Sequence, residues 1–344
     1  MKAAVFEKIE RFVIKDIPEP RAGAGEVRVR IRACAICGTD LRIYHYGHHH
    51  VQPPQVIGHE IAGVIDQVGA GVTGCTLGAP VTITPRIGCG HCYYCRRGQY
   101  NYCPNGRSFG YQLPGGYAEY IIVPPEGVSL GALIPIGGGL SFDEASLTEP
   151  LACCLRAQRT SGVGPGAVVA VIGGGPVGIL HCRLARARGA SVILIEREVE
   201  RLNAVSTAAI AKVVEPRRSD PRQEIRAFTK GRGADVVIVA CSSAEAQVEA
   251  LSLAGRGGRV NFFGGLPPGG SLITLDSNLI HYDEIQVQGS HGSTPEENRE
   301  AAALLASEQI EVKDLISRGF PLEAIEEAFH FAESRQGMKT VIHP

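Results

Sequence analysis

The chain has 344 residues, of which 44% are hydrophobic, enough to bury substantial cores in about two domains. Its 34 basic and 35 acidic residues leave a formal net charge of -1, which excludes an electrostatic basis for nucleic acid or an anionic membrane as main partner. No apolar run reaches the roughly 18 residues of a membrane span. The N-terminal segment MKAAVFEKIERFVIKDIPEP lacks an apolar signal core and a cleavage site, so we expect a cytoplasmic protein.

The first 130 residues or so are predicted to be rich in β-strands. Short alternating or β-branched runs are separated there by glycine and proline, as in EVRVRIRA, EIAGVIDQVG, PVTIT and YAEYIIVP. This pattern favours a barrel-like domain. The next segment, GLSFDEASLTEPLACCLRAQRT, is predicted to be helical because its acids come early and its apolar residues recur at intervals of three and four.

The second half of the chain alternates buried strands with helices. AVVAVI leads through a glycine turn into the helix PVGILHCRLARARG and the strand SVILI, and DVVIVACSS and GRVNFFGG follow as further strands. This alternation predicts a doubly wound parallel sheet of the α/β class. The tail returns to helices over TPEENREAAALLAS and PLEAIEEAFHFAES. The glycine-rich TSGVGPG at 160–166 is the best candidate for a joint between domains.

Eleven cysteines is an odd number, so disulfides cannot account for all of them. Four crowd together in GCGHCYYCRRGQYNYC, where C-x2-C spacing lets thiolates converge on one tetrahedral zinc ion and nearby glycines let the loop wrap it. A redox or iron–sulfur site and four unrelated buried thiols are the alternatives. An all-cysteine zinc site leaves no open coordination position, so the prediction is a structural zinc held by Cys89, Cys92, Cys95 and Cys103.

A dinucleotide site is predicted where a glycine motif joins the strand AVVAVI to the helix that Pro176 and Val177 begin. The glycines of this GxGxxG allow a tight turn, close approach of a pyrophosphate, and packing of helix on strand. Glu196 ends the next strand at the distance expected for a carboxylate that binds ribose hydroxyls. A turn without a ligand is the alternative. A nicotinamide cofactor is favoured, bound through Gly173, Gly175 and Gly178.

A second metal site is suggested by Cys37 in ACAICGTD and by His59 and Glu60 in VIGHEIAG. A thiolate, an imidazole and a carboxylate are the mixed set expected when zinc keeps a position open for water or substrate. The alternative is a buried thiol and a core histidine, because a loop separates the two segments.

GHExxG, the four-cysteine lobe and the later GxGxxG occur in this order, and with them the whole chain resembles the zinc-containing medium-chain dehydrogenases. TEPLAC, with Glu149, is similar to the sorbitol (polyol) and threonine dehydrogenase branch, because classical alcohol dehydrogenases place a cysteine there. The resemblance implies a β-rich GroES-like catalytic domain and a Rossmann domain. It places a zinc domain at 1–152 with its structural lobe at 88–104, an NAD-binding domain at 153–288, and a C-terminal segment completing the catalytic domain at 289–344.

The resemblance also implies roles for individual residues. Cys37, His59 and either Glu60 or Glu149 would hold a catalytic zinc, and Asp40 would orient the zinc-bound imidazole. Thr39 matches the hydroxyl that relays the substrate proton. On the cofactor side, Arg201 matches a position near the adenosine ribose, and the loops at Cys241–Ser242 and Gly264–Gly265 match those lining the nicotinamide.

The chain departs from both branches near the expected proton path. Threonine dehydrogenases carry CGTDxHIY, whereas Arg42 stands here in place of the relay histidine, and Ile43 replaces a tyrosine of sorbitol dehydrogenases. Neither named substrate is therefore assigned. His45 could supply the missing relay, since histidine exchanges protons near neutral pH. Alternatively, His45 and the run His48–His50 are solvated loop residues.

The predicted function is zinc-dependent, reversible oxidation of a secondary alcohol, a polyol or sugar derivative, by a nicotinamide cofactor. Glu196 favours NAD over NADP, although Arg197 beside it could reverse the choice. The alternatives are an L-threonine 3-dehydrogenase-like amino alcohol dehydrogenase and a non-catalytic nucleotide-binding protein, while a zinc-free reductase is disfavoured by the metal residues. The resemblance to this branch implies a homotetramer or at least a homodimer, and the apolar strands RVNFFGG and EIQVQGS could pair across a two-fold axis.

Overall fold

A computed structural model describes residues 1–137 and 139–344 of the chain. These residues form two compact units, Met1–Ala152 with Gly292–Pro344 and Cys153–His291. The division falls between Ala152 and Cys153, inside one helix, so the glycine-rich segment 160–166 lies within the second unit and is not the joint. Among the described residues, no helix has the length and apolar character needed to cross a membrane.

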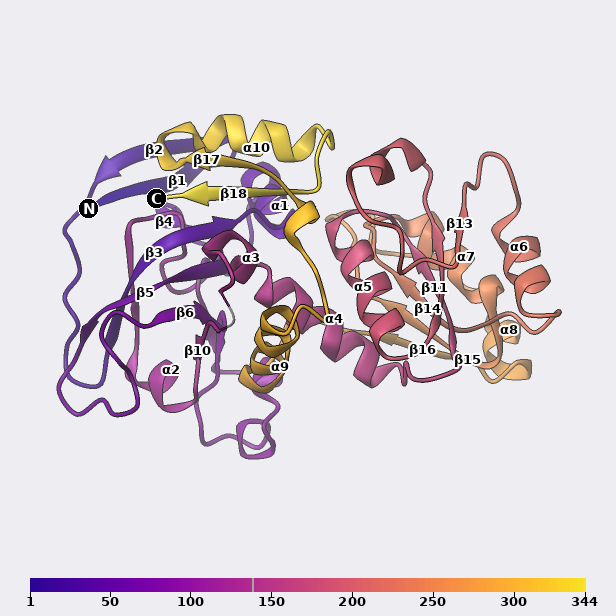
Figure 1. Cartoon of the computed structure of the whole chain (residues 1–344), viewed down its shortest axis with the longest axis horizontal. Helices are drawn as coiled ribbons and strands as arrows, with labels where there is room; N and C mark the ends of the chain where they lie inside the picture. The colour runs from indigo at the N-terminus through magenta and orange to yellow at the C-terminus, as the bar shows by residue number, and fades with distance from the viewer. Residues whose placement is uncertain (138) are drawn as a thin grey trace. The chain divides into compact units, whose positions relative to one another are not determined.

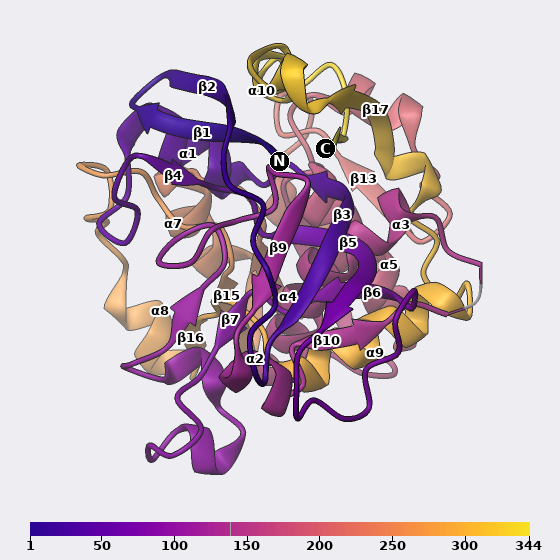
Figure 2. The ribbon, with the colours of Figure 1, turned by 90° about the vertical axis from the view of Figure 1, so that its left-hand side faces the viewer.

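The first unit contains most of its strands in one sheet of order β10-β6-β5-β3-β18-β17, with β9 also pairing β3 (Figure 1; Figure 2). The central pair, β3 and β5, is antiparallel. Hydrophobic residues alternate with arginines along β3, which buries one face of the strand. The strands of this sheet are β3 (Val27–Ala35), β5 (Glu60–Val68), β6 (Pro80–Ile83), β9 (Tyr120–Val123), β10 (Leu133–Pro135), β17 (Ile316–Pro321) and β18 (Lys339–His343).

Smaller sheets and helices complete this unit. A three-stranded sheet has the order β2-β1-β4, and β7 pairs with β8. These strands are β1 (Lys2–Lys8), β2 (Arg11–Asp16), β4 (Gln55–Val56), β7 (Arg86–Ile87) and β8 (Arg107–Ser108). The helices are α1 (Gly38–Tyr46), α2 (Pro125–Ser129), α3 (Phe142–Ser146), α4 (Thr148–Thr160, which continues into the second unit), α9 (Pro295–Ala306) and α10 (Ile325–Glu333).

The single helix predicted before residue 160 is two helices. Ser141 caps α3 through a capping box with Glu144, and α3 ends at Ser146 before α4 starts at Thr148. The break places Glu149 in the first turn of α4, where it is buried.

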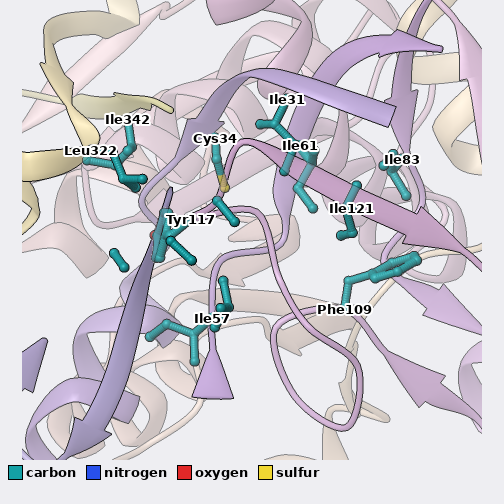
Figure 3. Packing of buried hydrophobic residues seen from close by; sticks show 14 of the residues in the cluster. Ile31, Cys34, Ile57, Ile61, Ile83, Phe109, Tyr117, Ile121, Leu322 and Ile342 are labelled. Carbon is teal, nitrogen blue, oxygen red and sulfur yellow. The ribbon is translucent and has the colours of Figure 1, made fainter. Parts of the chain in front are cut away.

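The core of the first unit joins chain segments that are far apart in the sequence. Figure 3 shows Tyr117 among Cys34, Ile57, Ile61 and, from the C-terminal segment, Leu322 and Ile342. These side chains are buried in one hydrophobic cluster. The C-terminal segment is therefore an integral part of the first unit.

The second unit is a parallel sheet of order β13-β12-β11-β14-β15-β16, the strand order of a Rossmann fold. Every residue of the central strand β11 is buried, as expected for a parallel strand covered on both faces. The strands are β11 (Val168–Ile172), β12 (Ser191–Ile195), β13 (Lys212–Val214), β14 (Ala234–Val239), β15 (Ala254–Phe262) and β16 (Gln286–Gly289). The helices are α5 (Pro176–Ala187), α6 (Pro221–Phe228), α7 (Ala244–Leu253) and α8 (Ser277–Tyr282).

Candidate active site and its metal centres

The four clustered cysteines converge in the loop between β7 and β8. Their ligand atoms all lie within 4.8 Å of one another. The Sγ atoms of Cys89 and Cys95 are 4.0 Å apart and those of Cys92 and Cys103 are 3.7 Å apart. A tetrahedral zinc with Zn–S bonds of about 2.3 Å requires edges of about 3.8 Å, whereas a disulfide requires about 2.05 Å. The spacing therefore fits a closed zinc site.

The lobe provides donors that stabilise thiolates. The N–H of Cys89 lies 3.3 Å from Cys103 Sγ, and the N–H of Cys95 lies 3.4 Å from Cys92 Sγ. Backbone N–H groups, led by that of His91, lower the pKa of Cys89 to about 6, while burial raises that of Cys95 to about 12. A deprotonated thiol is the form that binds zinc.

Neighbouring residues fix the shape of this loop. A Cβ on Gly88 would lie 2.7 Å from Cys95 Sγ, so a side chain there would displace a ligand. Arg86 Nη2 donates to the carbonyl of Cys103 at 2.7 Å and ties the last cysteine to β7.

The second predicted centre also converges. Ligand atoms of Cys37, His59 and Glu60 lie within 4.8 Å of one another. The antiparallel pairing of β3 with β5 places Ala35 opposite Glu60, which brings the segment after β3 beside the segment before β5. The register of the β3–β5 pair therefore brings Cys37 and His59 close together in space, although 21 residues separate them in the sequence.

Asp40 connects two of these residues. It is the third residue of α1 and is fully buried, and its Oδ2 accepts from the N–H of Cys37 at 2.9 Å in a capping-box arrangement. Its Oδ1 lies 3.3 Å from His59 Nδ1. Burial acts to lower the pKa of His59, but the Asp40 carboxylate overrides it and raises the pKa well above the usual value. With Nδ1 directed at Asp40, Nε2 remains for a metal.

Glu60 faces both a cation and the metal ligands. Lys339 of β18 donates to Glu60 Oε2 and, at 3.1 Å, to the carbonyl of Ile36. Glu60 Oε1 is buried and has no hydrogen-bond partner within the described part of the chain. Burial raises the pKa of Glu60 against the attraction of Lys339, and the nearby Glu149 carboxylate adds to the rise. An orphaned carboxylate oxygen beside a thiol and an imidazole fits the donor set of zinc.

The other predicted residues lie around this centre with varied partners. Glu149 is buried in α4 but is not part of the convergent trio. Arg42 donates to the hydroxyl of Thr39 at 3.2 Å. His45 Nδ1 is 2.9 Å from Glu10, and its Nε2 contacts Glu333 of α10.

Three residues near this centre were not predicted from the sequence. Lys339 contacts Glu60, and the hydroxyl of Tyr117 donates a hydrogen bond to Asp40 Oδ2 at 2.9 Å. The ring of Tyr111 lies 5.8 Å from that of His59, and burial raises the pKa of Tyr111 to about 12. Only the contacts of the folded chain reveal these residues, because no short motif contains them together with the ligands.

The glycine turn of the second unit has the geometry of a pyrophosphate site. Gly173 has φ +105°, and a Cβ on Gly178 would lie 1.8 Å from the Gly173 carbonyl oxygen, so helix and strand touch there. A Cβ on Gly175 would meet nothing within 4 Å, which leaves open space at the N-terminus of α5. This space, beside Pro176 and Val177, suits an anionic ligand.

The loops expected to line the cofactor adjoin this turn. A Cβ on Gly264 would lie 2.3 Å from the Cys241 carbonyl oxygen, and one on Gly173 would lie 3.0 Å from Cys241 Cβ. Glu196 is buried at the end of β12, where it accepts from the N–H groups of Gly174 and, at 2.8 Å, Glu198.

Arg201 lies in the short helical segment Val199–Ala204 that follows Glu196. Its Nε is buried without a hydrogen-bond partner within residues 1–137 and 139–344. Ser242 immediately follows Cys241, between β14 and α7. The structure therefore gathers Cys241 and Gly264 at the glycine turn and leaves the role of Arg201 as a prediction.

Comparison with known proteins identifies the family. Residues 23–132 match the alcohol dehydrogenase GroES-like domain, and residues 176–307 match the zinc-binding dehydrogenase domain. The L-threonine 3-dehydrogenase of Pyrococcus furiosus is 33% identical over 335 residues, 95% of this chain and 92% of that protein. The sorbitol dehydrogenase of Bacillus subtilis is 31% identical over 355 residues, 100% of this chain and 97% of that protein.

A solved structure agrees with these matches. The zinc-binding dehydrogenase of Sinorhizobium meliloti, bound to NADP, superposes with a TM-score of 0.91 at 32% identity and covers 100% of this chain and 99% of that one. The predicted fold class, a GroES-like domain with a Rossmann domain, is confirmed. The chain belongs to the zinc-containing medium-chain alcohol dehydrogenase family.

Proposed function

We propose that the protein catalyses the reversible oxidation of a secondary alcohol, a polyol or sugar derivative, with NAD as the hydride acceptor. The convergence of Cys37, His59 and Glu60, with one buried carboxylate oxygen left unpaired, carries the proposal. Unlike the four-cysteine lobe, this mixed set leaves a coordination position for substrate.

In this proposal the residues of the centre have two roles, namely binding the metal and orienting its ligands. Zinc held by Cys37, His59 and either Glu60 or Glu149 would act as a Lewis acid that makes an alkoxide accessible near neutral pH. Asp40 orients the imidazole of His59, and Lys339 holds one oxygen of Glu60.

The proton path starts at Thr39 in this proposal. Its hydroxyl exchanges a proton with the substrate oxygen, while Arg42 donates to Thr39 Oγ1. A guanidinium cannot accept a proton, so Arg42 fixes the hydroxyl without relaying. The relay through His45 stays a prediction, and its pairing with Glu10 and Glu333 provides two carboxylates that could take the proton further.

A substrate panel tests the function. Polyols, sugar alcohols, secondary alcohols and L-threonine would be scored by reduction of the cofactor, together with the zinc content of the purified protein. Turnover of polyols ahead of L-threonine supports the proposal, whereas preference for L-threonine would favour an amino alcohol dehydrogenase, the activity named for the Pyrococcus relative. Absence of turnover with every alcohol would indicate a non-catalytic nucleotide-binding protein.

We assign NAD as the preferred cofactor because of Glu196. Its buried carboxylate is held by two backbone N–H groups at the end of β12, so it cannot turn away from a bound ribose without losing both. The extra phosphate of NADP would face this charge, at a cost of a few kcal/mol or on the order of a hundredfold in affinity.

Steady-state kinetics with both cofactors tests this assignment. Glu196→Ala should reduce the ratio of the catalytic efficiency with NAD to that with NADP. The Sinorhizobium relative holds NADP, and Arg197 and Arg201 offer positive charge close to Glu196 in sequence. An efficiency with NADP equal to that with NAD, unchanged in Glu196→Ala, would overturn the assignment.

A homodimer or homotetramer is the proposed assembly. Of the two strands expected to pair, RVNFFGG falls in β15, which β14 and β16 already pair on both sides, so it is not available. Strand β16 lies at one edge of the parallel sheet, where its outer N–H and C=O groups could pair with a second copy. Sedimentation at micromolar concentration tests this, and a stable monomer would contradict it.

A further inference from the structure

We propose that Tyr117 is a positioning residue of the metal centre, because its hydroxyl fixes Asp40 and Asp40 in turn fixes the imidazole of His59. The inference rests on the zinc centre of the proposed function, but it concerns how the metal is retained and does not depend on the substrate.

The contacts form a chain of three side chains. Tyr117 donates to Asp40 Oδ2 at 2.9 Å, and the same oxygen accepts from the N–H of Cys37 at 2.9 Å. Asp40 Oδ1, the other oxygen, lies 3.3 Å from His59 Nδ1. Two donors therefore hold one carboxylate oxygen, so the other is presented to the metal ligand in a fixed direction.

The hydroxyl of Tyr117 is confined to this contact. Tyr117 and Asp40 are both 0% exposed, so water does not compete for either group. Burial raises the pKa of Tyr117 well above its usual value, which keeps the phenol protonated and a permanent donor. Removing it would leave the buried carboxylate oxygen with only the Cys37 N–H.

The ring of Tyr117 is fixed independently of its hydroxyl. It lies edge-on to Phe12 and Phe329, with centroids 6.4 Å and 5.9 Å away, and a Cβ on Gly58 would lie 2.9 Å from it. Its backbone N–H donates to Ile57 at 3.1 Å. Figure 3 shows the ring packed in this core. Tyr117→Phe should therefore retain the packing and remove only the hydrogen bond.

Tyr44 offers a matched control from the same aromatic cluster. It is also buried and stacks on Phe12 at 5.3 Å, but its hydroxyl donates to the backbone carbonyl of Glu10 at 3.1 Å. Tyr44→Phe removes one buried hydroxyl without touching Asp40.

The experiment measures the release of zinc from the full-length, zinc-loaded protein to the chelator 4-(2-pyridylazo)resorcinol. Tyr117→Phe should release one zinc per chain about tenfold faster and leave the other unchanged, because groups behind a metal-bound histidine typically contribute 10–100-fold in affinity. Tyr44→Phe should alter neither rate. Cobalt can then be put in place of the zinc that Tyr117→Phe releases faster. Compared with the unaltered protein, the visible absorption bands of this cobalt should shift in Tyr117→Phe and not in Tyr44→Phe.

A double-mutant cycle tests whether Tyr117 acts through Asp40. Asp40→Asn alone should accelerate release, and adding Tyr117→Phe should add little to it. Equal release rates in Tyr117→Phe and Tyr44→Phe, multiplicative effects in the double variant, or unfolding of Tyr117→Phe with loss of both ions would each overturn the proposal. Absence of the second zinc from the unaltered protein would instead refute the metal centre, and this inference with it.

Discussion

The ammonium group of Lys339 donates a hydrogen bond to Glu60, 279 positions earlier in the chain, and both side chains are at most 4% exposed. Despite burial, the Glu60 carboxylate raises the pKa of Lys339, which keeps the lysine charged. A cation from the C-terminal strand therefore neutralises an acid at the metal centre.

Lys339→Met should destabilise the protein by about 3–5 kcal/mol and weaken zinc retention, because it leaves Glu60 as an uncompensated buried charge. Urea unfolding and zinc analysis check this. Lys2→Met is the matched control, since the Lys2–Glu323 pair is about half exposed and should contribute less than about 1 kcal/mol. Equal stability of the two variants would contradict the assigned role of Lys339.

Cys95→Ser should lower stability and remove one zinc per chain, because a structural zinc contributes folding free energy directly. Metal analysis and thermal unfolding measure the two effects. Cys75→Ser, outside both metal clusters, should change neither. A fully stable Cys95→Ser protein that lacks one zinc would show that the lobe folds without metal.

His59→Ala should abolish turnover and leave the fold and cofactor binding largely intact, because in the proposed function His59 would hold the catalytic zinc, while the second unit carries the glycine turn. Turnover, circular dichroism and titration with the reduced cofactor separate these properties. Retained turnover would place the reacting centre elsewhere.

Gly175→Ala and Gly178→Ala should differ sharply although they lie in one motif. The new Cβ at 178 would lie 1.8 Å from a backbone oxygen, so that variant should unfold more readily. The new Cβ at 175 meets only open space, so that variant should fold normally and bind the cofactor more weakly. Thermal unfolding and cofactor titration measure both, and unchanged binding in Gly175→Ala would argue against a pyrophosphate there.

Stability should depend on pH through His45. Hydrogen bonds with Glu10 and Glu333 raise the pKa of His45 above 6.5. The stabilisation is therefore fully present below 6.5 and is lost as the pH rises through the raised pKa of the folded state. The difference in unfolding free energy between the unaltered protein and His45→Gln should shrink from pH 6 to pH 9. A constant difference would show that protonation of His45 does not stabilise the fold.

Local patterns predicted the parts of this protein that depend on short spacings. The four cysteines lie within one loop, and the glycine motif, its strand and its helix are consecutive, so sequence spacing nearly fixes their geometry. Hydrophobic alternation likewise indicated β3 and β5, although the helix predicted before residue 160 is two helices, with a break at Leu147 between α3 and α4.

Contacts made through tertiary structure could not be predicted in this way. Cys37 meets His59 only because β3 pairs with β5 in one particular register. Lys339 and Tyr117 reach Glu60 and Asp40 from distant strands and loops. A lysine in an apolar strand and a tyrosine in YAEY carry no signal of a metal partner when the sequence is considered alone.

The discontinuous first unit has a consequence for synthesis. Residue 339 leaves the ribosome after residues 153–291, so the nucleotide unit is complete before the strand that supplies Lys339 exists. Until then Glu60 lacks its cation, and β3 lacks the pairing of Ala35 with Val341. The nascent chain should therefore form a nucleotide-binding module first, and the metal centre should mature only after β18 has been made and docks on β3.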